Sequence, residues 1–277
     1  MNVQRPDVLL VANSLSAEYE TTIDWLGQHS CLRMVTLERA RNGLSSGVFH
    51  PDIMVVVQSR PGEVSQSEIE QLRSLAPLSC LAGILGGWCE GEMRSGRPWS
   101  GVCRYYWHQW PARFASQWER LTKGECPDWC VPLTFSNDER LLNMSQQSIQ
   151  KGKAHIAVVA RHQVTIDGIT GMCAALGYST VAILPHAERK ETTADAVLWD
   201  VDCHSTNASD IFGKLSNDWR RSPIVALVNY PRHGETERWL QSGAAAVMSK
   251  PLMLDELQWQ LKRVLATRES AFPWAVA

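Results

Sequence analysis

The chain has 277 residues, of which 44% are hydrophobic and 20% are charged, as in a soluble globular protein long enough for two ordinary domains. A formal net charge of −2 excludes an overall field that would draw the chain onto nucleic acid or anionic lipid. The apolar runs are too short to span a bilayer, and the run at residues 8–12 is too short for a signal peptide, so we expect a cytoplasmic protein without a membrane partner.

The first half of the chain alternates apolar, β-branched runs with helical patterns. Strands are predicted at residues 7–12, 33–37, 52–57, 80–85 and 102–107, and helices at 17–26, 67–75 and 112–121. Strands that are apolar on both faces and alternate with helices indicate a parallel sheet covered on both sides. We therefore expect an α/β domain with a flavodoxin-like, doubly wound, five-stranded sheet over residues 1–121.

The segment 86–110 lies between the predicted fourth strand and the last predicted helix, and we call it the Trp-rich loop. It is rich in Trp, Tyr and Arg, the residues that anchor protein interfaces. Its candidate interaction residues are Trp88, Cys89, Glu90, Arg97, Trp99, His108 and Trp110. We favour an interpretation in which most of these aromatic side chains fill the space of a missing helix and Arg–Glu pairs hold the loop in place. The remainder is available for a protein partner, whereas the two glutamates and the near-neutral charge count against base stacking and a nucleic-acid partner.

Residues 87–91 read Gly-x-Cys-x-Gly, a pattern on which amidotransferases and hydrolases carry a nucleophilic cysteine. Such a cysteine needs a helix directly after it, because the helix N-terminus lowers the pKa of the thiol. Three glycines and a proline follow instead, and Glu90 and Glu92 oppose thiolate formation. His108 is a candidate base with no carboxylate at a triad-like spacing. We expect Cys89 to lie in a structural loop.

The periodic patterns stop in residues 122–153, which we interpret as a linker. Cys126 and Cys130 stand at a Cys-x3-Cys spacing that zinc tolerates, but the cysteines upstream form no matching pair, so we predict no metal site. Because the chain is expected to be intracellular, its eight cysteines favour reduced thiols over a disulfide framework.

The second half repeats the order of elements over residues 154–268 and ends in a tail at 269–277. Strands are predicted at 155–160, 179–184, 195–201, 223–228 and 245–249, and helices at 165–176, 209–219, 235–242 and 254–266. The repetition indicates a tandem duplication, with a second flavodoxin-like domain after the linker.

Two stretches of the second half carry a family resemblance: "AVLWDV" at residues 196–201 and "SGAAAVMSKPLMLDEL" at residues 242–257. They resemble a receiver domain of bacterial response regulators. The resemblance implies that Asp200 stands at the phospho-acceptor position. It also implies that Lys250, before a proline, stands where the family's lysine pairs with the phosphoryl oxygens.

The chain departs from that family in three other features of the phosphorylation site, at four positions. Ala160 and Arg161 replace an acidic pair that holds Mg²⁺, Val228 replaces a Ser or Thr, and Met248 replaces an aromatic switch residue. Because Mg²⁺ offsets the repulsion between a carboxylate and a phosphoryl donor, and one carboxylate is a poor Mg²⁺ site, phosphotransfer is not expected.

Two arrangements of the pocket remain open from the sequence. In one, Arg161 and Lys250 both pair with Asp200 in the place of the metal. In the other, Asp200 and Lys250 form an ion pair while Arg161 points to solvent. Asp202 is a further candidate member of this pocket.

The first half has lost more of the family pattern. Val57 is predicted to stand where Asp200 stands, and Trp110 where Lys250 stands. Ala12 and Asn13 replace the acidic pair, so no phospho-acceptor is expected in this half.

The resemblance implies a non-enzymatic signalling protein of the two-component type, built from tandem degenerate receiver domains, or pseudo-receivers. We expect it to act without phosphorylation, through contacts with a protein partner, a homodimer being one option, and without a cofactor. One alternative is a phosphorylatable receiver that uses Asp200 and Lys250. Another is a Cys89-dependent enzyme of the amidase or glutaminase type.

Overall fold

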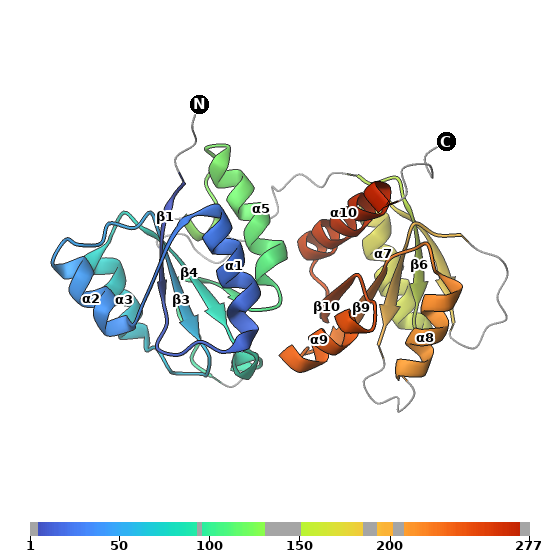
Figure 1. The fold of residues 1–277 in the computed structure, drawn as a ribbon, viewed down its shortest axis with the longest axis horizontal. Helices are drawn as coiled ribbons and strands as arrows, with labels where there is room; N and C mark the ends of the chain where they lie inside the picture. Colours follow the sequence, from blue (N-terminus) through green and yellow to red (C-terminus); the bar gives the residue numbers. More distant parts are fainter. Residues whose placement is uncertain (1–4, 93–95, 131–150, 185–192, 202–207, 272–277) are drawn as a thin grey trace. The chain divides into compact units, whose positions relative to one another are not determined.

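A computed structural model of the chain describes residues 5–92, 96–130, 151–184, 193–201 and 208–271 (Figure 1). The chain divides into two compact units, Met1–Gln147 and Ser148–Ala277. None of the helices in the described ranges is long and apolar enough to cross a bilayer.

The first unit is built on a sheet of five parallel strands. These are β1 (Asp7–Val11), β2 (Cys31–Val35), β3 (Ile53–Gln58), β4 (Cys80–Leu85) and β5 (Cys103–Tyr106). The strand order is β2-β1-β3-β4-β5, so the order reverses at β1. In such a doubly wound sheet, functional groups gather outside the carboxyl ends of the strands.

Helices cover both faces of this sheet (Figure 1). The helix α1 (Glu20–His29), which follows the short turn η1 (Ala17–Tyr19), and α5 (Trp110–Thr122) pack on one face. The other face is covered by α2 (Leu37–Ser45) and α3 (Gln66–Leu75). The sheet thus has a separate apolar core on each side.

The helix α2 was not predicted from the sequence. It is largely polar on the outside and buries only Leu37, Ala40, Gly43 and Leu44. Its start is fixed by Thr36, whose side chain accepts a hydrogen bond from Arg39 N, a helix N-cap. A stripe of so few apolar residues over nine residues is too weak a periodic pattern to detect.

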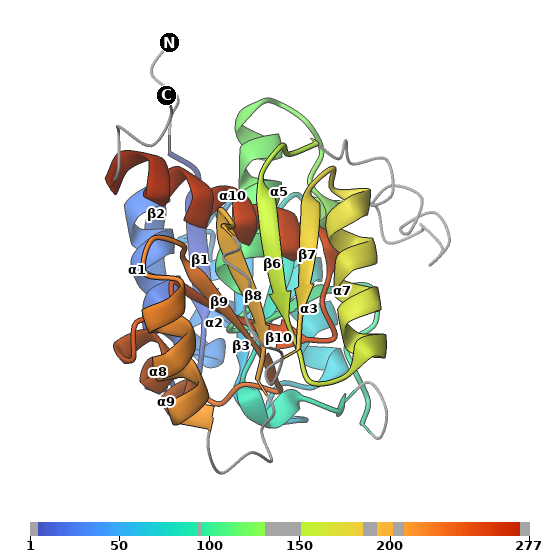
Figure 2. The same cartoon turned by 90° about the vertical axis from the view of Figure 1, so that its right-hand side faces the viewer.

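The second unit repeats the topology with β6 (His155–Val159), β7 (Ser179–Ile183), β8 (Ala196–Asp200), β9 (Ile224–Asn229) and β10 (Ala246–Lys250). Its strand order, β10-β9-β8-β6-β7, is the first order read from the other edge (Figure 2). One face packs against α7 (Gln163–Ala175) and α10 (Leu254–Ala271), and the other against α8 (Ala208–Asp218) and α9 (His233–Gln241).

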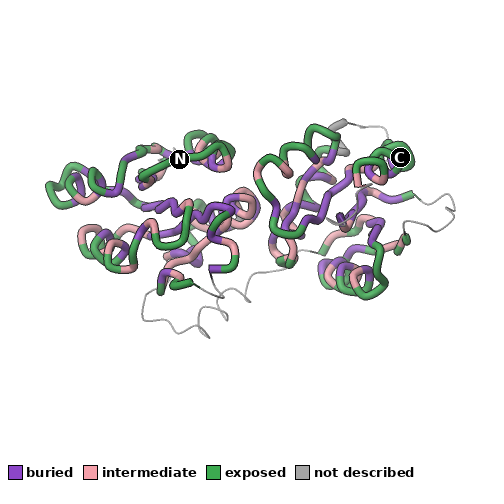
Figure 3. The backbone as a smooth tube through the Cα atoms, turned by 90° about the horizontal axis from the view of Figure 1, so that it is seen from below, coloured by how far each residue is buried: buried purple, intermediate pink, exposed green. Residues whose placement is uncertain are grey.

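These two sheets confirm the predicted fold class of tandem, flavodoxin-like, doubly wound domains with five parallel strands each. In both units the inner strands β1, β3, β4, β6, β8 and β9 are deeply buried, because helices cover both of their faces, whereas the edge strands β2 and β7 are more exposed (Figure 3). The segments that link the strands carry most of the exposed residues.

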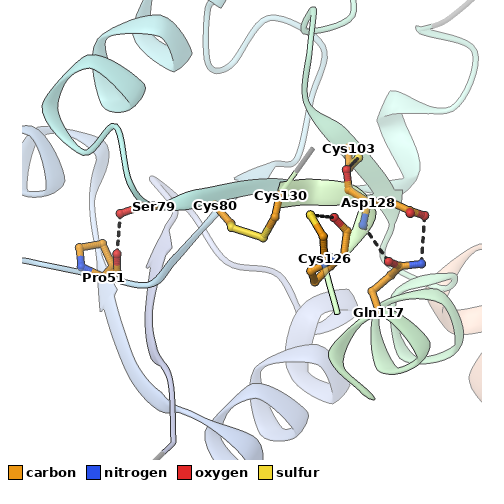
Figure 4. The surroundings of a disulfide bond; sticks show 9 residues. Pro51, Ser79, Cys80, Cys103, Gln117, Cys126, Asp128 and Cys130 are labelled. Carbon is orange, nitrogen blue, oxygen red and sulfur yellow. Dashed lines mark hydrogen bonds between the residues drawn. A yellow bond between two sulfur atoms is a disulfide. The ribbon is translucent and has the colours of Figure 1, made fainter. Parts of the chain in front are cut away.

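The first unit contains a disulfide between Cys80, which opens β4, and Cys130 in the short turn η3 (Asp128–Cys130) (Figure 4). The expectation of reduced thiols was therefore wrong for this pair. Asp128 anchors the same segment, since it accepts hydrogen bonds from Gln117 Nε2 at 3.0 Å and from Arg120 Nη1 at 3.0 Å. The sequence gives no sign that residues 50 positions apart meet, because the contact depends on how the segment after α5 folds back onto β4.

Candidate functional site

Asp200 and Lys250 end the strands β8 and β10, and parallel strands bring their carboxyl ends to one edge of the sheet. Lys250 Nζ donates a hydrogen bond to Asp200 Oδ1 and forms an ion pair with it. Since β9 lies between β8 and β10, this pair bridges the carboxyl end of β9. The side chains are 21% and 11% exposed for Lys250 and Asp200, so the pair is largely withdrawn from water.

The neighbouring positions of the predicted pocket are apolar. Ala160, Val228 and Met248 are all buried, with exposed fractions of 1%, 0% and 1%. None of these three side chains carries an oxygen, the ligand atom that Mg²⁺ requires. Arg161 follows the end of β6 and is exposed, and Asp202 lies outside the described residues.

Strand register shows which residues of the first unit occupy the equivalent positions. Val56 pairs with the last residue of β1 and Trp199 with the last residue of β6, so the residues that follow them, Val57 and Asp200, hold equivalent places. Val57 in turn pairs with Ile84, as Asp200 pairs with Leu227.

Ile84 pairs with Tyr105 and Leu227 pairs with Met248, so Tyr105 and Met248 hold equivalent places. Two residues later in the chain come Trp107, just after β5, and Lys250, the last residue of β10. Trp107 therefore holds the place of Lys250 in the first unit.

The predicted equivalence of Trp110 and Lys250 was therefore wrong. Trp110 is the first residue of α5, is fully buried, and stacks on Phe114 with ring centroids 3.8 Å apart. The prediction aligned two prolines with different roles. Pro111 lies in the first turn of α5, where a proline is tolerated, whereas Pro251 follows β10 directly.

Cys89 ends the short turn η2 (Gly87–Cys89), and its side chain is fully buried. Its Sγ donates to the backbone oxygen of Gln58 at 3.3 Å. Burial, with a smaller effect from the charge of Glu92, raises the pKa of the Cys89 thiol to about 12. The thiol is thus protonated near neutral pH, the opposite of an activated nucleophile.

Trp99 occupies the sheet face that α9 covers in the second unit. Its ring belongs to the core of β3, β4, α2 and α3, and its Nε1 donates to Val64 O at 2.8 Å. Gly83 in β4 leaves room for the ring, because a Cβ atom there would lie 2.7 Å from it. Trp99 is therefore part of the fold of the first unit.

Two carboxylates of the loop are paired with basic side chains. Glu92, only 4% exposed, accepts from Gln58 Nε2 at 3.1 Å and from Arg104 Nη1 at 3.3 Å. Glu90 Oε1 lies 3.1 Å from His108 Nε2, with both side chains largely buried. These contacts hold the first part of the loop to β3, to β5 and to the residues just after β5.

Only two of the seven predicted interaction residues are exposed. Trp88 is 67% exposed, with the guanidinium of Arg60 at 6.0 Å from the centre of its ring, and Arg97 is exposed as well. The other five are buried or paired within the unit: Cys89, Glu90, Trp99, His108 and Trp110.

The structure adds two contacts at this edge that the sequence did not indicate. Tyr19 OH donates to Ser59 Oγ at 3.2 Å, and burial raises the pKa of Tyr19. The carboxylate of Glu18 accepts from Gly87 N at 3.1 Å and so holds η2 to η1. No spacing or motif relates these residues, which lie up to 69 positions apart.

In the described part of the chain, no group of three or more His, Cys, Asp and Glu side chains could hold a metal ion. Cys130, one of the two cysteines considered for zinc, is in the disulfide with Cys80.

No family model and no curated protein matches the chain. Several solved structures do. The chain is similar to response-regulator receiver domains. A CheY-like receiver domain protein from Methanospirillum hungatei JF-1 is 16% identical over 45% of this chain and 99% of that chain, with a TM-score of 0.36. The receiver domain of a signal transduction histidine kinase from Syntrophus aciditrophicus is 20% identical over 41% and 91%, with a TM-score of 0.34.

NtrX from Brucella abortus is also similar, with 17% identity over 44% of this chain and a TM-score of 0.40. The match spans 29% of the length of NtrX. At these identities, the similarity to receiver domains is one of fold.

Proposed function

We propose that the chain is a signalling protein of the two-component type, in which pseudo-receiver domains act through protein contacts and without phosphorylation. The observation that carries this proposal is the ion pair between Lys250 and Asp200. The carboxylate that would accept a phosphoryl group already has a cationic partner.

The residues around the pair also support loss of phosphotransfer. Mg²⁺ takes about six oxygen ligands and usually binds through one or two carboxylates. Ala160 supplies no oxygen at the first position of the family's acidic pair, and Arg161 places a cation at the second. We propose that Arg161 and Lys250 both pair with Asp200 in the place of the metal and hold the pocket in one state, with Asp202 as a further member of the pocket.

The first unit is proposed to act as a binding domain, because Val57 has no nucleophilic atom at the position of Asp200. Its exposed Trp88 beside Arg60 offers an aromatic and a cationic group to a protein partner. The partner is a second copy of this chain or another protein, and the proposed location is the cytoplasm. We propose neither enzymatic activity nor a cofactor.

Intact mass measured after incubation with acetyl phosphate and Mg²⁺ tests the proposal. We expect no added phosphoryl group on the native chain, and none on Asp200→Asn. A phosphoryl group on the native chain that is absent from Asp200→Asn would instead establish the alternative, a phosphorylatable receiver that uses Asp200 and Lys250.

A second variant tests whether the missing metal ligands are the reason that the native chain gains no phosphoryl group. Ala160→Asp combined with Arg161→Asp restores two carboxylates beside Asp200, and we expect this variant to gain a phosphoryl group from acetyl phosphate in the presence of Mg²⁺ but not of EDTA. If it stays unmodified while its circular dichroism is native, the acidic pair is not what the pocket lacks.

A further inference from the structure

The second unit has a cavity of about 390 Å³ at the amino ends of β9 and β10. Asp200 and Lys250 lie at the carboxyl ends of their strands, so this cavity is at the opposite edge of the sheet. Its volume is within the range of about 300–1,000 Å³ that small-molecule sites occupy. The proposed pseudo-receiver function makes no use of it.

The inner wall of the cavity is apolar. Trp219 follows α8, Ile224 opens β9 and Val264 belongs to α10, and they are 7%, 4% and 3% exposed. All three belong to the cores of the unit, so the wall is fixed by packing. A fixed apolar wall can bind the hydrocarbon part of a ligand without further ordering of side chains.

The rim of the cavity is cationic. It includes Arg220 and Arg221, which follow α8, and Arg263 from α10, whereas none of the described residues that line the cavity is a carboxylate. Arg263 is oriented by two contacts, from Nε to Gln260 Oε1 at 3.1 Å and from Nη2 to Ala245 O at 3.2 Å.

Arg220 and Arg221 have no such partners. Within the described ranges, neither side chain takes part in a hydrogen bond or an ion pair. Three guanidinium groups around one cavity repel one another, and an anion between them removes that repulsion. A guanidinium also matches the geometry of carboxylate, sulfonate and phosphate groups, to which it donates two parallel hydrogen bonds.

We propose that this cavity binds a small organic anion. Its apolar body would pack on Trp219, Ile224 and Val264, and its carboxylate, sulfonate or phosphate group would bind Arg220, Arg221 and Arg263. The site requires both features of the ligand, because the wall contributes apolar contact and the rim contributes charge.

Isothermal titration calorimetry of the full chain with naphthalene-1-sulfonate tests this site. Two probes each carry only one feature of that ligand: 1-naphthalenemethanol has the apolar body without the charge, and sodium sulfate has the charge without the apolar body. We expect naphthalene-1-sulfonate to bind at least about tenfold more tightly than either single-feature probe. The proposal is overturned if naphthalene-1-sulfonate does not bind at millimolar concentration, or if the neutral probe binds equally well.

Variants locate the binding. We expect Arg220→Gln combined with Arg221→Gln, and separately Arg263→Gln, to weaken binding of naphthalene-1-sulfonate by about tenfold or more. The control is Arg238→Gln, which removes a charge from an exposed position of α9 outside the cavity. Arg220 and Arg221 are exposed, so their replacement leaves the core intact. Unchanged binding in the cavity variants, or equal weakening in Arg238→Gln, would contradict a site at this cavity.

Discussion

The environment of Cys89 decides whether the Gly-x-Cys-x-Gly pattern marks an enzyme. Burial raises the pKa of the Cys89 thiol to about 12, so the thiol is protonated and not an activated nucleophile near neutral pH. We predict that iodoacetamide near neutral pH modifies the exposed Cys31 and Cys126 and leaves Cys89 unmodified. Peptide mass mapping measures this, and the urea-unfolded chain, in which all free thiols react, is the control. Rapid modification of Cys89 in the folded chain would revive the amidase-type alternative.

The ion pair at the edge of the second sheet makes a prediction about stability. Lys250→Met removes the ammonium group that pairs with the largely buried carboxylate of Asp200, so we expect the free energy of unfolding of the second unit to fall by about 1–3 kcal/mol. Adding Asp200→Leu should recover part of that loss, because no charge is then left unpaired. Urea titrations followed by circular dichroism measure both changes.

The matched control for this pair is Lys214→Met, at an exposed position of α8. We expect it to change the free energy of unfolding by less than about 0.5 kcal/mol. If Lys250→Met is equally neutral, the ion pair does not hold the pocket in one state, and the physical basis of the proposed function is lost.

At the scale of elements, the ten strands in the described parts of the chain could all be predicted from the sequence to within two residues, because short β-branched runs bounded by turns are a local signal. The helix α2 could not, since its burial depends on contacts with α3 and β1 rather than on its own apolar stripe. The meeting of Asp200 and Lys250 was predictable because parallel strands end together. The roles of Trp107 and Trp110 were not, because they depend on strand register rather than on residue order.

The loop between β4 and β5 provides a matched pair of tryptophan variants. Trp99→Ala removes a ring from a core and a hydrogen bond to Val64, so we expect it to lower the free energy of unfolding of the first unit by about 3–5 kcal/mol. Trp88→Ala, at a 67% exposed position of the same loop, should change it by less than about 0.5 kcal/mol. Comparable losses in both variants would argue against the structural role assigned to Trp99.

The disulfide makes a prediction for the segment that follows α5. It closes a loop of 50 residues, and in the chain-entropy description this stabilises the first unit by about 4 kcal/mol. We expect Cys80→Ala combined with Cys130→Ala to lose most of that stability and to match the native chain in a reducing agent. Cys126→Ala, which removes a free and exposed thiol, is the control. A double variant as stable as the oxidised native chain would show that the disulfide does not stabilise the unit.

At the scale of the whole molecule, the same sheet topology occurs twice with different side chains at equivalent positions. In the first unit, Trp99 covers part of the sheet face that α9 covers in the second unit. The second unit has the Asp200–Lys250 pair, with the apolar side chains of Ala160, Val228 and Met248 at neighbouring positions, whereas Val57 stands at the place of Asp200 in the first unit. One fold is thus packed in the same way in both copies, while the side chains at the carboxyl ends of the strands differ between them.

Each apolar core contains residues of one unit only. Changes in different cores are therefore expected to act independently. We predict that Trp99→Ala and Lys250→Met shift two different urea transitions, and that their effects in the combined variant add to within about 0.5 kcal/mol. Circular dichroism for the whole chain and mass-detected hydrogen exchange for each unit measure this. A coupling above about 1 kcal/mol would show that the two units unfold as one, and the tandem arrangement would then be a single cooperative structure rather than two domains.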